Sequence, residues 1–235
     1  MRHNHEHNTQ EAVRASFCYT QTVNHLPKNI CSEWVKKYPS FEVVGTIKSG
    51  KEANVWLVQI KEIPYALKVY DPMAQLSTKG QYTEGQWINE SSLRKAVKQK
   101  TKIGKTLQQK LWTKREYYLL KKLFEQGAIV PEVFDYTDNT ILMQYLGDEI
   151  GFAPRLIDIE LSVSVKTQIL VEIEASIKLF LDNGIVHGDL SAYNILWWDG
   201  KPWVIDFPQA VDVRHNPNWK QFYERDMQNI KKYLG

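Results

Sequence analysis

Cysteine is almost absent from this chain of 235 residues, which contains only Cys18 and Cys31. Two cysteines are too few for a disulfide framework, and no further metal ligands are spaced around them as in a zinc site. Long apolar runs are also missing, since no segment reaches the ~18 uncharged apolar residues that could span a membrane. The polar, histidine-rich first ten residues do not resemble a secretion signal. We therefore expect free thiols and a cytoplasmic protein without a membrane anchor.

Glycine and proline are scarce as well, with 12 and 9 residues, whereas 43% of the residues are hydrophobic and 12% are aromatic. This composition excludes a flexible linker or a disordered chain, because it supplies enough apolar surface for a core. The length is about one and a half times that of a typical domain. We expect one large domain or two lobes around a cleft.

Charge is unevenly distributed, although the net charge is only +3. Eleven Lys and Arg residues lie between Arg94 and Lys122 against a single acid, Glu116, so this segment carries +10 and the rest of the chain −7. Such a segment is suited to nucleic acid or other phosphates, because neutralising phosphates releases counterions. A solvated helix face beside a mobile loop would have the same composition, and the sequence alone leaves both interpretations open.

The first half of the chain alternates β-rich segments with one helical segment. Three strands rich in Val, Ile, Tyr and Trp form an antiparallel meander, a mobile loop follows at about 72–110, and a helix precedes two further strands. The helix is predicted to place Leu111, Tyr118, Leu119, Lys122 and Leu123 near one face. The predicted ranges are 41–48, 53–60 and 65–70 for the first strands, 111–126 for the helix, and 132–136 and 140–144 for the last strands.

The second half is mainly helical. Apolar residues at helical spacing predict a helix over 162–181, and a second amphipathic helix over 218–234. Between them, Asp199-Gly200 predicts a short hairpin that joins strands at 195–198 and 203–205.

The most informative segment is His187-Gly188-Asp189-Leu190-Ser191-Ala192-Tyr193-Asn194. Asp189 precedes Asn194 by five residues, and Asp206 follows Asn194 by twelve, at the end of the predicted hairpin. Phosphotransferases use this spacing to place a hydroxyl-orienting carboxylate and two oxygen ligands for magnesium around a triphosphate.

A lysine in the first half supports the same chemistry. Lys68 lies between apolar residues on the third predicted strand, where an ammonium group needs an anionic partner. Glu116 on the following helix is a suitable carboxylate to hold it, although a surface glutamate would look the same. The turn after the first strand contains Ser49 and Lys51 and has only two glycines five residues apart, so it is a weak phosphate-loop signal.

These residues resemble motifs of the RIO family of atypical protein kinases, and the first RIO subfamily more than the second. The resemblance runs from about residue 41 to 234 and departs from the family at Ala192, where Glu is usual, and at Phe207-Pro208. The matching motifs are Ser49-Gly50-Lys51-Glu52-Ala53, Ala153-Pro154-Arg155-Leu156, His187-Gly188-Asp189-Leu190-Ser191, Tyr193-Asn194, and Ile205-Asp206 with Gln209-Ala210-Val211.

The resemblance implies an α+β, two-lobed protein-kinase-like fold. The small mixed N-lobe with its antiparallel sheet would span 41–142 and include the loop at about 72–110. The short, mostly helical C-lobe would span 143–235 and lack the usual activation segment, because only 29 residues follow Asp206. Residues 1–40 would be an extension in which no element is defined.

The resemblance also implies the roles of individual residues. Asp189 would orient the attacking hydroxyl, Asn194 and Asp206 would bind magnesium, and Asp206 would also be able to form an aspartyl-phosphate. Lys68, paired with Glu116, would hold the phosphates of ATP. The other implied ATP contacts are Ser49 and Lys51 at the phosphates, and Met143, Gln144 and Leu146 around the adenine.

The implied function is ATP- and magnesium-dependent phosphoryl transfer, as serine autophosphorylation, as phosphorylation of a protein Ser or Thr, or as an ATPase switch. RNA or a maturing ribosomal particle would be the partner, through the basic segment between Arg94 and Lys122. One alternative is a small-molecule kinase like the aminoglycoside phosphotransferases, against which Gln209-Ala210-Val211 and the Ser49 motif count. Another is a nucleotide-sensing factor that binds RNA or ribosomes and has no protein substrate.

Overall fold

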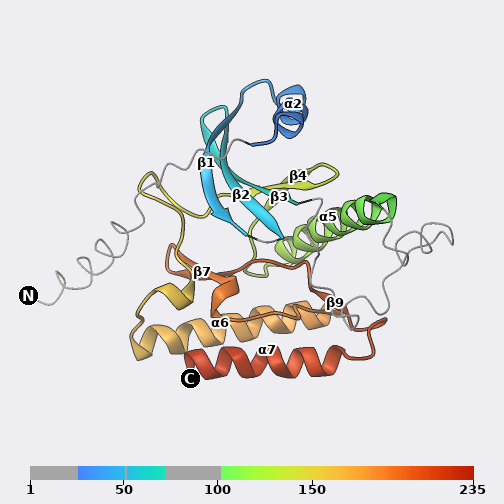
Figure 1. Cartoon of the computed structure of the whole chain (residues 1–235). Coiled ribbons are helices and arrows are strands. Elements are labelled where there is room, and N and C mark those ends of the chain that lie inside the picture. Colours follow the sequence, from blue (N-terminus) through green and yellow to red (C-terminus); the bar gives the residue numbers. More distant parts are fainter. Residues whose placement is uncertain (1–25, 51, 72–101) are drawn as a thin grey trace, which may run out of the picture.

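The structure, a computed structural model, describes residues 26–50, 52–71 and 102–235, and in it a sheet lies above a helical layer (Figure 1). The sheet is antiparallel, with the order β1-β2-β3-β5-β4. Its first three strands form the predicted meander, and β4 and β5 continue it on the β3 side. The strand bounds are β1 Phe41–Ser49, β2 Ala53–Ile60, β3 Ile63–Tyr70, β4 Val133–Tyr136 and β5 Thr140–Gln144.

The helix that follows the third strand is longer than predicted. It is α5, Lys102–Glu125, so residues 102–110 are helical and not part of a loop. The rest of the predicted loop, 72–101, lies outside the described residues. The predicted face was also wrong at three positions, because Leu111 is 37% and Tyr118 52% exposed, and Lys122 is exposed as well. The buried face contains Glu116, a polar residue that the apolar pattern could not count, together with Trp112, Leu119, Leu120 and Leu123.

A helix precedes the sheet in the region where the sequence pattern defines no element. Helix α2, Lys28–Lys37, packs on the outer side of the sheet, at the top of Figure 1. Its Trp34 is fully buried and donates a hydrogen bond from Nε1 to Thr140 Oγ1 at 2.9 Å. Lys37 and Tyr38 both bind the carboxylate of Asp135 on β4. The last part of the predicted extension therefore packs as part of the N-lobe.

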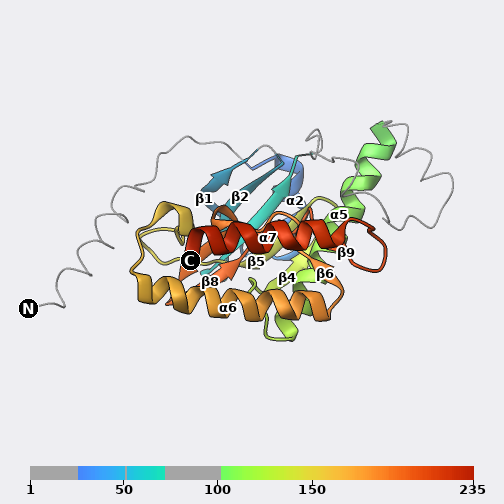
Figure 2. The same cartoon turned by 90° about the horizontal axis from the view of Figure 1, so that it is seen from below.

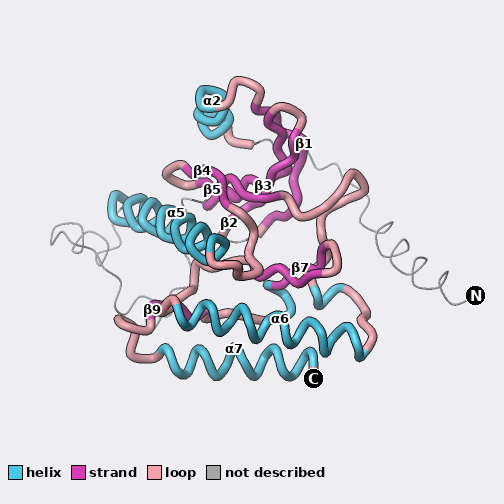
Figure 3. Tube along the Cα trace, turned by 180° about the vertical axis from the view of Figure 1, so that it is seen from behind, coloured by secondary structure: helices cyan, strands magenta, loops and turns pink. Residues whose placement is uncertain are grey.

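The C-lobe is built on two long helices, α6, Val163–Asp182, and α7, Trp219–Leu234, which lie side by side in Figures 2 and 3. Strand β6, Ile185–Val186, pairs with β9, Val211–Asp212, and β7, Ile195–Trp198, pairs with β8, Lys201–Val204. The second hairpin strand starts two residues earlier than predicted. Asp199 and Gly200 both have positive φ, which makes a two-residue turn with Trp198 opposite Lys201.

The two lobes share a hydrophobic core. Its buried residues include Leu120 and Leu123 of α5, Ile173 of α6 and Ile195 of β7. A separate cluster around Trp34, between α2 and the sheet, stabilises the N-lobe. No helix in the described ranges is both long enough and apolar enough to cross a membrane.

Candidate active site

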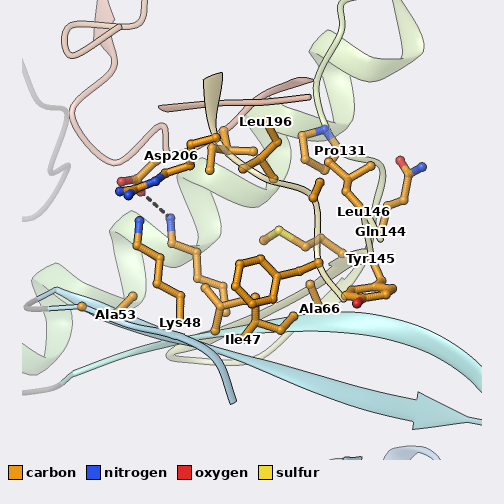
Figure 4. Close-up of a pocket in the computed structure, with 18 of the residues that line it drawn as sticks. Ile47, Lys48, Ala53, Ala66, Pro131, Gln144, Tyr145, Leu146, Leu196 and Asp206 are labelled. Atoms are coloured by element: carbon orange, nitrogen blue, oxygen red, sulfur yellow. Dashed lines mark hydrogen bonds and ion pairs between the residues drawn. The ribbon is translucent and has the colours of Figure 1, made fainter. Parts of the chain in front are cut away.

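A cavity of about 560 Å³ opens between the sheet and the C-lobe, within the usual size of a small-molecule site. Figure 4 shows Asp206 at one end and Gln144, Tyr145 and Leu146 at the other. The lining includes residues from β1, β2, β3, α5 and β7 and from the loops around Asp189 and Asp206. Charged groups gather at the Asp206 end, and apolar residues line much of the remainder.

Lys68 of β3 is the centre of the charged end. Its Nζ lies 2.8 Å from Glu116 Oε1 and 2.9 Å from Asp206 Oδ1, and the side chain is almost completely buried. Burial lowers the pKa of Lys68, but the two carboxylates more than compensate and raise it above its ordinary value. The lysine is therefore positively charged at neutral pH, and it connects the sheet, α5 and the C-lobe.

Glu116 links α5 to the segment that follows Asp206. Its Oε1 also accepts a hydrogen bond from the Phe207 amide at 3.3 Å, while its Oε2 is buried and has no partner in the described structure. The neighbouring Arg115 donates from Nη2 to the Ala210 carbonyl oxygen at 2.8 Å. A buried carboxylate oxygen without a partner is costly, so Oε2 is a candidate for contact with a ligand, ion or water.

Asp206 has an unusual backbone conformation, with φ at +71°. Residues other than glycine rarely adopt this region, and such strain is concentrated at functional sites. The side chain is 44% exposed because it faces the cavity. Desolvation raises the pKa of Asp206, but the Lys68 ammonium outweighs it and lowers the pKa below its ordinary value. Asp206 is thus an ionised carboxylate directed into the cavity.

Asp189 and Asn194 are neighbours, as their spacing predicts. The Asn194 amide nitrogen donates to the Asp189 carbonyl at 2.9 Å and to its Oδ2 at 3.3 Å. Partial burial raises the pKa of Asp189, against the opposing effect of Arg225. The side-chain nitrogen of Asn194 is used in these bonds. Its side-chain oxygen is therefore the atom that could bind a hard metal ion.

His187 links the loop that contains Asp189 to the segment that ends at Asp206. Its Nδ1 accepts a hydrogen bond from the Asp189 amide at 3.3 Å, so its Nε2 carries the proton and donates to the Ile205 carbonyl at 3.1 Å. Burial lowers the pKa of His187 to about 4, which keeps the ring neutral. The neutral imidazole therefore holds the loop with Asp189 against the residue before Asp206.

Helix α7 holds the same loop from below, which the sequence analysis missed. Asp226 accepts hydrogen bonds from the amides of Gly188 at 2.7 Å and Leu190 at 3.0 Å. Asn229 donates to the Leu190 carbonyl, and Arg225 donates to that of Gly188. Burial raises the pKa of Asp226 to about 6, although the two amides act in the opposite direction. The sequence contained one signal for Asp226. It lies four residues after the inward-facing Phe222, so both residues are on the same face of the helix.

The far end of the cavity is formed by the connection between the lobes. Met143, Gln144 and Leu146 all line it, as predicted for an adenine site. The Gln144 amide already donates to Glu132, and the Leu146 carbonyl accepts from Ala153. Leu146 is a buried residue, and no described residue accepts a hydrogen bond from its backbone amide. This amide is a donor that a planar heterocycle could use.

The predicted phosphate loop is only partly placed. Lys51 lies outside the described residues, and Ser49 is exposed at the end of β1 and is not part of the cavity lining. Among the described residues, no group of three or more His, Cys, Asp or Glu side chains is arranged to hold a metal ion. A magnesium site with two protein ligands does not require such a group, since phosphates and water complete the coordination.

The fold and this site define a class of protein. A lysine from the sheet binds both a glutamate from a helix and an aspartate of the lower lobe, at one end of a cavity between the lobes, which is the arrangement of a protein-kinase-like phosphotransferase. The predicted α+β, two-lobed architecture is confirmed. The RIO domain family model matches residues 54–235, and the chain belongs to this family.

Individual relatives agree with this assignment. The chain is similar to the serine/threonine-protein kinase RIO1 of Chaetomium thermophilum, with 31% identity over 233 residues that cover 91% of this chain and 41% of the relative. It is also similar to the RIO-type serine/threonine-protein kinase Rio1 of Thermoplasma acidophilum, with 33% identity over 124 residues that cover 53% of this chain and 63% of the relative. The chain thus spans about two fifths of the RIO1 relative.

A solved structure shares the fold. It is the Rio2 kinase–ADP/Mg2+–phosphoaspartate complex from Chaetomium thermophilum, with a TM-score of 0.65 and 24% identity, covering 87% of this chain and 58% of that chain. At this level of identity the likeness supports the two-lobed fold.

Proposed function

We propose that this chain catalyses ATP- and magnesium-dependent phosphoryl transfer of the RIO kinase type. The observation that carries the proposal is the contact of Lys68 with Glu116 and Asp206 at 2.8 and 2.9 Å, at the end of a cavity that also contains Asp189. Family membership favours this proposal over a small-molecule kinase, and the curated relatives are named serine/threonine-protein kinases.

The residues of the cavity fit ATP and magnesium. The Leu146 amide and the apolar walls suit the adenine, and the Lys68 ammonium suits the phosphates. Asp206 and the side-chain oxygen of Asn194 would supply the hard oxygen ligands that magnesium prefers; Asn194 is not itself part of the cavity lining but is bonded to Asp189, which is. Met143 and Gln144 would complete the adenine pocket, and Ser49 and Lys51 remain proposed contacts of the phosphate loop.

Asp189 is the proposed catalytic base. Its carboxylate would accept the proton of the attacking hydroxyl, and Asn194 and His187 would keep the carboxylate and its loop in place. Lys68, held by Glu116, would orient the phosphates. When bound, ATP supplies the phosphoryl group and magnesium screens its charge. Asp206 would keep the metal close to Lys68 and limit the repulsion between phosphates and carboxylates.

The test is incubation of the purified protein with γ-labelled ATP and magnesium, in wild type, Asp189→Ala and Asp206→Ala. Loss of the base is expected to reduce transfer by about 10²–10⁴-fold, while nucleotide binding, measured by calorimetry, stays within about twofold. Val171→Ala, at an exposed position on α6, controls for activity that a variant loses during purification. Full transfer by Asp189→Ala would contradict the assignment.

The chemical stability of the label separates two forms of the reaction. Label that survives acid and disappears in both Asp variants indicates phosphorylation of a hydroxyl of the chain itself. Label that is lost in hydroxylamine indicates an acyl phosphate, which in the proposed alternative would form on Asp206 when its carboxylate oxygen bonds to the γ-phosphorus of ATP and ADP leaves. The Rio2 relative is described as a phosphoaspartate complex. Released phosphate without label would indicate an ATPase switch.

For the partner, we infer RNA or a ribosomal particle that contacts the segment between Arg94 and Lys122. Among the α5 side chains that the structure describes, Lys110 is paired with Asp138 and Arg115 with the Ala210 carbonyl. The exposed Lys114, Lys121 and Lys122 are available for a polyanion. Replacing these three lysines by Gln should reduce the slope of log affinity against log salt by about 2 to 3 for RNA. An unchanged slope would exclude this face. A cytoplasmic location is part of the same proposal, and cell fractionation tests it.

A further inference from the structure

Lys48 lines the cavity but has no role in the site as described so far. The described lining contains three cations, Lys48, Lys68 and Arg155, and five carboxylates, those of Glu52, Glu116, Asp158, Asp189 and Asp206. Lys68 is held by two carboxylates, and Arg155 binds Asp158 with Nε at 2.6 Å from Oδ2. Lys48 is the one lining cation that makes no hydrogen bond or ion pair with another described residue.

The strand register places Lys48 in the same cross-strand row as Lys68. Lys48 of β1 lies opposite Val55 of β2, and Val55 lies opposite Lys68 of β3. Directly opposed residues project to the same face of a sheet. The two lysine Cα positions are therefore about 10 Å apart, two strand spacings, above the same cavity.

A β-bulge directs Lys48 to this face. The register shifts between Thr46 and Lys48, so Ile47 and Lys48 together oppose Val55. With regular pairing, Ile47 alone would oppose Val55 and Lys48 would project to the other face. Figure 4 shows the Lys48 side chain extending from β1 toward Asp206. Its charge also contributes to the lowered pKa of Asp206, which agrees with this position.

We propose that Lys48 is a further phosphate-binding lysine besides Lys68 and Lys51, which binds the β- or γ-phosphate of the nucleotide from the β1 side of the cavity. The inference rests on the proposed ATP site and extends it. Lys68 is already neutralised by Glu116 and Asp206, and the described lining is net negative, so a polyphosphate needs a further cation besides magnesium. Lys48 is exposed and uncommitted, so it can supply this charge without breaking an existing contact.

The test is calorimetric binding of Mg-ATP, Mg-ADP and AMP to the wild type and to Lys48→Gln, Lys48→Arg and Lys36→Gln. Lys48→Gln is expected to weaken ATP about 10-fold and to leave AMP within twofold. Lys48→Arg keeps the charge and should retain most of the ATP affinity. Lys36 is exposed on α2, away from the cavity lining, so Lys36→Gln controls for net charge.

Each result has a defined meaning. Unchanged ATP binding in Lys48→Gln, or equal weakening of ATP and AMP, overturns the role of Lys48 in phosphate binding. Equal weakening in Lys36→Gln also overturns it, because the effect would then be one of net charge. If the wild type binds no nucleotide at all, the proposed function fails and the Lys48 inference with it.

Discussion

At the scale of single residues, the site depends on ionisation states that the fold imposes. His187 is the clearest example, because its ring is buried between the Asp189 amide and the Ile205 carbonyl and must remain neutral. An imidazolium there would lose the acceptor for the Asp189 amide. The protonation state of one side chain thus controls the position of the proposed base.

This predicts a pH dependence of stability. The folded pKa of His187, about 4, lies below the ordinary value of 6.5, so the unfolded chain binds the proton first as pH falls. The contribution of His187 is complete above pH 6.5 and declines between pH 6.5 and 4, by about 3 kcal/mol in total. Asp226, whose pKa is raised to about 6, titrates in the same range with the opposite sign, so the His187 slope is measured as the difference between wild type and His187→Gln in urea unfolding at several pH values. His187→Gln should remove it, and a variant with the wild-type slope would contradict the assignment.

At the scale of elements, α7 positions the loop that carries Asp189. Asp226 accepts from the amides of Gly188 and Leu190, and Asp226→Asn leaves one of these buried donors facing an amide NH2 group. We expect kcat to fall about 10-fold or more, while the KM for ATP changes less than twofold, because the nucleotide site is formed by other elements. Steady-state kinetics with Gln228→Ala, an exposed neighbour, as the control separates the two parameters. A parallel rise in KM would contradict a positioning role.

The N-terminal helix α2 is a second element whose importance the structure reveals. Trp34 is fully buried and bonded to Thr140, so Trp34→Ala should destabilise the chain by about 3–5 kcal/mol. Val35, the next residue, is 40% exposed, and Val35→Ala should cost less than about 0.5 kcal/mol. Denaturant unfolding of both variants measures the difference. Equal stabilities would show that α2 is not part of the folded N-lobe.

At the scale of the whole molecule, the lobes are joined around the cavity by the shared core and by the contacts of Lys68, Arg115 and Glu116. A ligand between the lobes should therefore stabilise the entire described fold. At 100 times its Kd, Mg-ATP should add about 2.7 kcal/mol and raise Tm by roughly 5–10 °C.

Differential scanning fluorimetry with and without EDTA checks this. The part of the shift that EDTA removes should also be absent in Asp206→Asn, because that variant lacks the ionised metal ligand. A shift that is equal in wild type and Asp206→Asn would show that Asp206 holds no metal.

The sequence by itself determined the parts that depend on neighbouring residues. The Val-, Ile-, Tyr- and Trp-rich composition of β1 to β3, the amphipathic pattern of α6 and α7 and the turn at Asp199-Gly200 are local signals, so these elements were predictable within a few residues. The spacing of Asp189 and Asn194 is local in the same way. Their contact through one short loop follows from five residues of chain.

Only the tertiary structure decided the contacts between distant segments. Lys68 meets residues 48 and 138 positions away, and which carboxylates it binds depends on how α5 and the C-lobe pack against the sheet. The burial of Asp226 and of Trp34 depends likewise on neighbours far along the chain. Sequence periodicity indicates which side of an element is apolar, but it does not indicate which other element packs against that side. The site is formed by this packing of elements against one another.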